Sequence, residues 1–267
     1  MSLLSRFQIA REPDKSKAIE RLVVGSTPDF DFFLLIVLAV LMATIGLLID
    51  SASVVIGSML IAPILYPVLS LALSVTLSDY ALFYRSVVTL GKAAALGVGL
   101  ALLTTVLSPG ELTMTNELVG RVEPSLAYFM IAVISGLAVA YSLFQPELNE
   151  AFPGIAVSVA LLPPLASAGV MLGMSDWSAA VGAFALFAVN VLGILFAALV
   201  SFSLMNLSVK KQVVTATMLK EQKRIAEEQE AIRELDEKNL KQPAPDHDGR
   251  APDEGADDSR TNAHHAH

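Results

Sequence analysis

Long apolar runs separated by short polar stretches fill most of the chain. Six of them lie between residues 29 and 206, at 32–49, 52–77, 86–107, 124–144, 151–173 and 177–204. A helix of about 18 residues or more is long enough to cross the roughly 30 Å hydrocarbon core of a bilayer. The pattern therefore predicts an all-α, polytopic membrane protein with six transmembrane helices.

The composition supports this prediction. Hydrophobic residues make up 54% of the chain and charged residues 16%, and the mean hydropathy is +0.60. Soluble domains carry a larger charged fraction. Residues 29–206 contain ten acids but only three bases, Arg85, Lys92 and Arg121, so no basic surface for nucleic acid is expected. The lipid bilayer is the expected surrounding.

The flanking segments carry most of the basic residues. Five bases lie in an N-terminal segment, residues 1–28, and five more closely follow the last span, whereas the three loops on the other side hold one, Arg121. Because Lys and Arg near short loops stay on the cytoplasmic side, both termini are predicted to be cytoplasmic, in a prokaryotic plasma or inner membrane. Residues 207–241 predict a cytoplasmic helix, and the acidic, proline-containing residues 242–267 predict a disordered tail.

The second and fifth apolar runs resemble each other. Residues 53–80 read SVVIGSMLIAPILYPVLSLALSVTLSDY, and residues 154–177 read GIAVSVALLPPLASAGVMLGMSDW. Each contains two prolines in mid-span, Pro63 with Pro67 and Pro163 with Pro164, and each ends in Ser-Asp-aromatic before a long span. The membrane domain thus divides into two halves of three spans, about 30–107 and 124–204.

An odd number of spans in each half predicts an inverted repeat, because the second copy enters the membrane from the opposite side. A proline also displaces the carbonyl four residues earlier, here that of Met59, Pro63, Val159 or Ala160. In lipid such a carbonyl needs a partner from protein, water or an ion. Matched broken helices of this kind mark the solute sites of secondary transporters, although proline kinks without function also occur in membrane helices.

Two stretches resemble a known family. Residues 50–63 read DSASVVIGSMLIAP, with Pro67 following, and residues 154–165 read GIAVSVALLPPL. Over about residues 20–205 the chain is similar to the prokaryotic membrane proteins grouped as domain of unknown function 389, the uncharacterised hydrophobic domain. The resemblance implies a multi-pass membrane fold and brings no activity with it.

Polar residues within the spans are candidate site residues, because they are rare in membrane helices and usually face the bundle interior. Lys92 either lines a solute path through the bundle or extends its ammonium back to the membrane interface. Asn190 either lines the path or joins helices by hydrogen bonds. Tyr66, between the first two prolines, is either a path hydroxyl or interior packing.

Polar turns precede the two broken spans. Asp50 and Ser51 form a tight outer turn, where Asp50 is expected to cap the start of the second span. Glu147, Asn149 and Glu150 precede the fifth span in the same way. Acids at both mouths suit a cation path, and solvated loop acids are the ordinary alternative.

The expected function is transport or channelling of a small solute or ion between the two halves at the broken helices. The alternative is a membrane scaffold or sensor whose cytoplasmic helix and tail recruit partners. An enzyme is not expected, because no Gly-x-Ser-x-Gly, His-Glu-x-x-His or paired intramembrane Asp occurs. We also expect no cofactor and no metal site, since the chain has no cysteine and its first histidine is His247. Small residues in the spans favour a homo-oligomer.

Overall fold

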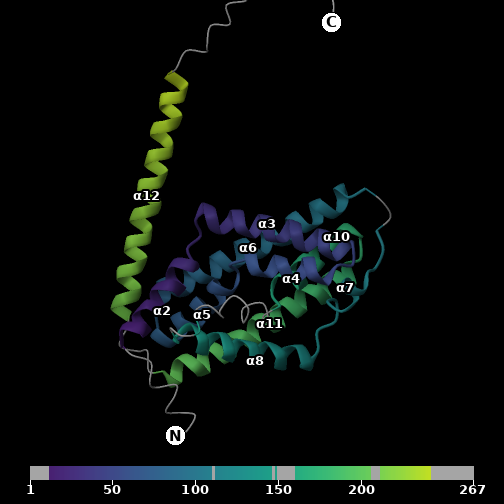
Figure 1. Ribbon diagram of the computed structural model, residues 1–267, viewed down its shortest axis with the longest axis horizontal. Coiled ribbons are helices and arrows are strands. Elements are labelled where there is room, and N and C mark those ends of the chain that lie inside the picture. Colours follow the sequence, from purple (N-terminus) through teal and green to yellow (C-terminus); the bar gives the residue numbers. More distant parts are fainter. Residues whose placement is uncertain (1–11, 110–111, 146–147, 149–159, 206–210, 242–267) are drawn as a thin grey trace, which may run out of the picture. The chain divides into compact units, whose positions relative to one another are not determined.

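The computed structural model describes residues 12–109, 112–145, 148, 160–205 and 211–241 (Figure 1). The chain divides into two compact units, residues 1–225 and 226–267. The helices of the first unit are packed side by side around one apolar core.

Four helices are long and apolar enough to cross a membrane: α3 (Phe30–Leu48), α6 (Tyr80–Leu107), α8 (Leu126–Leu143) and α11 (Trp177–Leu204). A fifth candidate crossing is the pair α4 (Ala52–Ile61) and α5 (Leu65–Leu77), which are bent by 50° at the break between them. The shorter α10 (Leu162–Gly173) is the described part of the predicted fifth span, whose residues 151–159 lie outside the described residues. The predicted helical membrane class is confirmed, with four to five candidate spans.

The helices pack in a pattern that crosses between the two halves of the chain. The second-half helix α10 packs against α6, and the first-half helix α5 packs against α11 (Figure 1). The contact between α6 and α10 is very close, because a Cβ on Gly169 would lie 2.5 Å from the carbonyl oxygen of Val98. Bare glycine backbone permits this approach.

The helices α6 and α11 begin in the same way. Asp79 and Asp176 are their N-caps, and each Asp Oδ1 accepts the backbone N–H three residues on, at 3.0 Å from Leu82 N and from Ala179 N respectively. Each Asp follows a serine of positive φ, 50° at Ser78 and 62° at Ser175. Both helices are 28 residues long. The Ser-Asp-aromatic sequence thus encodes the same turn and cap twice.

The N-terminal segment contains a helix that the sequence analysis missed. In α2 (Glu12–Gly25), Ala18, Ile19, Leu22 and Val23 are buried against the bundle, where α2 contacts α5. The Ser70 Oγ donates to the Leu22 carbonyl at 2.9 Å across this contact. The segment is therefore part of the packed unit.

A helix is present as α12 (Lys211–Lys241) within the range 207–241 for which one was predicted. Val214, Thr217 and Glu221 are buried in the first unit, whereas residues 226–235 are exposed. The Lys211 Nζ donates to the Ser78 carbonyl at 3.1 Å. The start of α12 thus packs on the bundle at the turn between α5 and α6.

Candidate functional site

The first helix break lies between Ile61 and Leu65. The last regular bond of α4 runs from Ala62 N to Ser58 O at 3.3 Å, and the chain resumes with Tyr66 N donating to Pro63 O at 3.2 Å. Pro63 has no N–H to continue the helical ladder, so the helix ends there. The expected interruption at this proline is present.

The second break lies at the start of α10. Pro163 and Pro164 occupy the first turn of α10, where the missing N–H groups are not needed. The side chain of Asn190, from α11, donates through Nδ2 to the Ala160 carbonyl at 2.7 Å. This is the carbonyl four residues before Pro164, and it precedes the N-cap Leu161, so no N–H of α10 bonds it. Asn190 is 4% exposed, so the bond is made inside the bundle.

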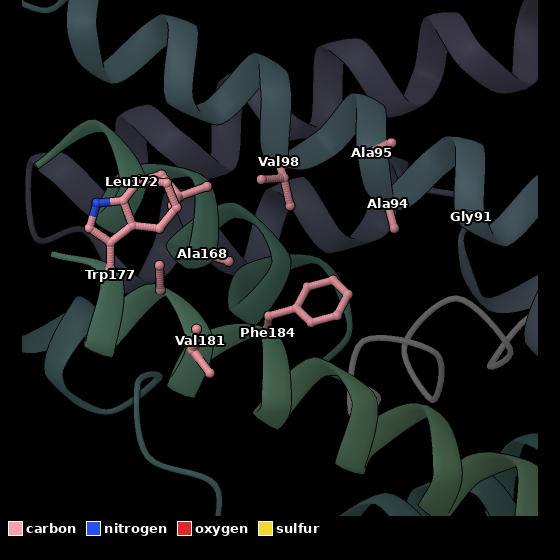
Figure 2. Close-up of a pocket in the computed structure, with 10 residues that line it drawn as sticks. Gly91, Ala94, Ala95, Val98, Ala168, Leu172, Trp177, Val181 and Phe184 are labelled. Carbon is pink, nitrogen blue, oxygen red and sulfur yellow. The ribbon is translucent and has the colours of Figure 1, made fainter. Parts of the chain in front are cut away.

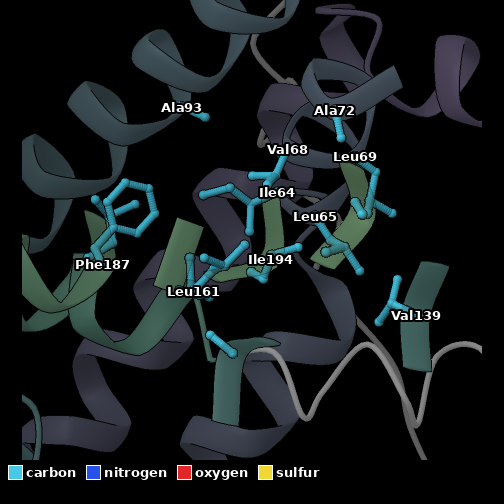
Figure 3. Close-up of a cluster of buried hydrophobic side chains, with 14 of the residues drawn as sticks. Ile64, Leu65, Val68, Leu69, Ala72, Ala93, Val139, Leu161, Phe187 and Ile194 are labelled. Carbon is cyan, nitrogen blue, oxygen red and sulfur yellow. The ribbon is translucent and has the colours of Figure 1, made fainter. Parts of the chain in front are cut away.

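Aliphatic side chains surround both breaks. Figure 3 shows Ile64, Leu65 and Val68 from the first break close to Leu161 from the second and Ile194 from α11. All five are buried, with exposed fractions from 0% to 6%. Both breaks are therefore packed by apolar side chains in this conformation.

Three buried hydroxyls have no hydrogen-bond partner in the described part of the chain. Ser86 and Thr89 lie on α6, and Ser167 lies in α10, one turn past Pro163. Their side chains are at most 1% exposed. Serine and threonine in a helix usually bond a carbonyl of the preceding turn, as Ser201 does with Ala197, at 2.9 Å. Unpartnered buried hydroxyls mark places where water or a solute can bind.

Tyr66 lies beside α2. Its ring packs on Gly25, where an added Cβ would come within 2.7 Å of the ring. A cavity of about 460 Å³ opens there, lined by Tyr66, Val24, Gly25 and the charged Lys17, Glu20 and Arg21. Pro67, the next proline, is buried. Tyr66 thus lies between the break and a charged surface.

Lys92 is exposed on the outer surface of α6. Its neighbours Gly91 and Ala95 line an apolar groove of about 510 Å³ between α6, α10 and α11 (Figure 2). This placement agrees with the alternative in which the ammonium reaches the interface and does not line a path.

Asp50 caps a different helix from the one expected. Its Oδ2 accepts from Asn116 Nδ2 at 2.8 Å and its Oδ1 from Glu117 N at 2.9 Å, at the start of the short helix α7 (Asn116–Val119). These bonds lower the pKa of the Asp50 carboxyl below its ordinary value of 3.8. The N-cap of α4 is Ser51, whose side chain makes no capping bond. The physical reason is the left-handed backbone of Asp50, with φ 55°, which belongs to the turn out of α3.

The other predicted groups are not brought together with these. Glu147, Asn149 and Glu150 lie outside the described residues, as does the tail of residues 242–267. Among the side chains that the structure describes, no group of three His, Cys, Asp or Glu is placed to hold a metal ion. At the second break the geometry offers a hydrogen bond between a side-chain amide and a backbone carbonyl.

Comparison with known proteins gives the family. Residues 59–196 match the domain of unknown function DUF389. An uncharacterised protein of Methanocaldococcus jannaschii is 30% identical over 175 residues, which cover 66% of this chain and 54% of that protein. The chain therefore spans about half the length of this curated relative. No solved structure matches it. Together with the apolar helices, the match shows that the chain is a membrane protein belonging to the DUF389 family.

Proposed function

We propose that this protein moves a small solute or ion across the membrane, with the crossing point between two inverted halves at the helix breaks. The observation that carries the proposal is the bond from Asn190 to the Ala160 carbonyl. A freed carbonyl with a replaceable side-chain partner, held between helices of a bundle, is the kind of group with which broken helices bind solutes in transporters.

The two-halves arrangement is supported by matched local structure. The caps at Asp79 and Asp176 have the same geometry, and the helices that follow them have the same length. In an inverted repeat, α5 corresponds to α10 and α6 corresponds to α11. The contact of α5 with α11 then corresponds to the contact of α10 with α6. Six spans and an inverted repeat follow if residues 151–161 and α10 together form the fifth crossing.

The apolar packing at the breaks favours a transporter over a permanently open channel. Ile64, Leu161 and Ile194 close the crossing point in the described conformation. A solute can pass only if these helices rearrange, which is the alternating access expected of inverted repeats. The same packing also favours a second candidate function, a membrane scaffold in which the breaks are packing devices and the exposed residues 226–235 recruit a partner.

We further propose the orientation and assembly that the sequence pattern favours. Both termini are cytoplasmic, in a prokaryotic plasma or inner membrane, because the bases flank the outermost spans. The exposed face of α6 carries Gly91, Ala95 and Gly99 at intervals of four residues. Such small residues permit close contact between spans, which supports a homo-oligomer.

Cysteine accessibility distinguishes the two functions, because the chain has no cysteine of its own. Ala62→Cys and Ala160→Cys each place one thiol at a break, and Ala39→Cys, buried in α3, is the matched control. The proteins are reconstituted in sealed vesicles and treated with a membrane-impermeant thiol reagent from one side at a time.

A transporter predicts that both break positions react from both sides, at rates that change between conformations, while Ala39→Cys stays unreactive. A scaffold predicts that the two break positions stay as unreactive as the control. That second outcome contradicts transport through the breaks.

A further inference from the structure

We infer that the transported solute is a small anion, and that Arg85 with the hydroxyls of Ser86 and Thr89 forms its first binding site at one end of α6. This inference rests on the proposed function and specifies its substrate class. It is carried by the charge of the spans and by the unpartnered donors of three residues on one helix.

The fixed charge within the spans is basic. In the described spanning helices, acids are limited to Asp31, in the exposed first turn of α3, and the bases are Arg85 and Lys92. Of these two, Arg85 is half-buried and Lys92 is exposed. Pores that pass anions are lined by Arg or Lys, whereas rings of Asp or Glu select cations. In the described spanning helices Arg85 is therefore the charged residue that is not exposed, and its charge disfavours a cation beside it.

Arg85 has donors to spare. Its Nη2 donates to the hydroxyl of Thr27, and its Nε has no partner in the described part of the chain. A guanidinium carries five N–H donors in a planar fork that suits carboxylates, phosphates and other oxyanions. An anion at Arg85 would give its Nε–H the partner that the described residues do not provide.

The nearby acids are already engaged. Asp29 and Glu221 act on Arg85 electrostatically. Both carboxylates, however, pair with Arg224, at 2.8 Å and 2.9 Å, and Asp29 also caps α3 by accepting from Phe32 N at 2.9 Å. They partly balance the charge of Arg85 without occupying its Nε.

The hydroxyls of Ser86 and Thr89 extend the site along α6. Thr89 lies one turn beyond Arg85, so the two are neighbours on the helix surface, and Ser86 lies beside them. Both hydroxyls are buried and unpartnered in the described structure. A hydroxyl donates its proton to an anion without carrying charge of its own, so the pair can pass an anion inward from the guanidinium.

A cation path is less favoured for a second reason. Asp50, one of the acids expected at a mouth, is held by Asn116 and Glu117 and is committed to the loop. Its carboxylate serves as a structural cap.

Two thiol reagents of similar size and opposite charge test the inference: 2-sulfonatoethyl methanethiosulfonate and 2-(trimethylammonium)ethyl methanethiosulfonate. Ser86→Cys and Thr89→Cys are purified as single-cysteine proteins in lipid nanodiscs, where both faces are accessible. Ser201→Cys is the buried control whose hydroxyl already has a partner, and Ser203→Cys is the exposed reference. The ratio of the sulfonate rate to the ammonium rate is measured at each position.

We expect this ratio to be about tenfold higher at Ser86→Cys and Thr89→Cys than at Ser203→Cys, because the two reagents differ by two charges and a unit charge one helical turn away acts on them with the strength that it has in water. Adding Arg85→Gln should remove the preference and Arg85→Lys should keep it, with Ser201→Cys unreactive throughout. If Arg85→Gln does not fold, the comparison of Ser86→Cys with Ser203→Cys in the presence of Arg85 still tests the preference for the anionic reagent.

A preference for the ammonium reagent, or the same ratio as at Ser203→Cys, would contradict an anion as the solute. Reaction at these positions would still indicate a water-filled path. Failure of both reagents to react at Ser86→Cys and Thr89→Cys would overturn the site itself. Reactivity of Ala62→Cys and Ala160→Cys at the breaks reports separately on transport, so the two proposals fail independently.

Discussion

The guanidinium of Arg224 and the carboxylate of Asp29 meet at 2.8 Å, joining α12 to the first turn of α3. The same guanidinium lies 2.9 Å from Glu221, a residue that is 6% exposed. The first part of α12 is thus held by ion pairs as well as by the buried Val214. It is fixed to the membrane unit at the end where α3 and α6 begin.

Replacing Arg224 should loosen this part of α12 without unfolding the bundle. Because the Arg224 side chain is 50% exposed, Arg224→Met should lower the free energy of unfolding by only about 0.2–1 kcal/mol. Hydrogen exchange should become faster over residues 211–225 and stay unchanged in α6. Arg233→Met, which removes a charge from the exposed part of α12, is the control and should change neither. Equal protection of residues 211–225 in both variants would show that the ion pairs do not hold the helix.

Removing the amide of Asn190 should destabilise the second break. Asn190→Leu keeps the volume but leaves the Ala160 carbonyl without this donor, which costs about 1–3 kcal/mol for a buried group. The melting temperature in detergent should fall accordingly. Ser201→Ala is the control, because it removes a bond within one helix and should cost less. A loss no greater than that of Ser201→Ala would mean that the carbonyl finds another partner.

Gly169→Ala should separate α6 from α10. The new Cβ would lie 2.5 Å from Val98 O and 2.6 Å from Ala101 Cβ, and overpacking of this kind costs about 1–3 kcal/mol. Thermal unfolding measures the loss. Gly99→Ala places the same methyl group on α6 where nothing lies within 4 Å, so it should be tolerated. Equal stability of the two variants would contradict the close contact.

The bonds of Asp50 should respond to pH in the acidic range only. Its pKa is lowered in the folded protein, so the stabilisation of the loop is fully present above the ordinary value of 3.8 and is lost as the pH falls through the lower folded value. Limited proteolysis of residues 109–125 should be the same at pH 7 and pH 5 and faster near pH 3. Asp50→Asn should give the faster cleavage already at pH 7, with no further change on acidification. Acid-dependent cleavage that persists in Asp50→Asn would assign the effect to another group.

The sequence predicts best where one residue type decides the local structure. The length of the apolar runs predicts the long apolar helices. Pro63 alone ends α4, because no neighbour can replace its missing N–H. The repeated Ser-Asp-aromatic gives the caps at Asp79 and Asp176. Sequence reasoning also identified both the freed Ala160 carbonyl and the bridging capacity of Asn190. It did not predict their contact, which depends on how α10 and α11 pack.

The missed features depend on tertiary contacts between segments far apart in the sequence. Ala18, Ile19, Leu22 and Val23 form an apolar face on α2, a periodic signal that the many charges of the segment obscured. In α12 the packed face includes Glu221, which is 6% exposed, although charged residues are rarely buried. Asp50 was assigned to the nearest helix in sequence, whereas its bonds reach residues more than 60 positions away.

Glycine contacts also decide which helices can shift against each other. A Cβ on Gly136 of α8 would lie 2.9 Å from the Ile194 Cα, and one on Gly193 of α11 would lie 2.7 Å from the Ala132 Cβ. Two helices that touch backbone to backbone at two levels cannot rotate without steric overlap, so α8 and α11 should move as a rigid pair. The seam between α5 and α11 is different, because α5 contains no glycine and its neighbour's glycines face elsewhere. Side chains that can change rotamer separate the helices there, and this seam is where the bundle can open with the least resistance.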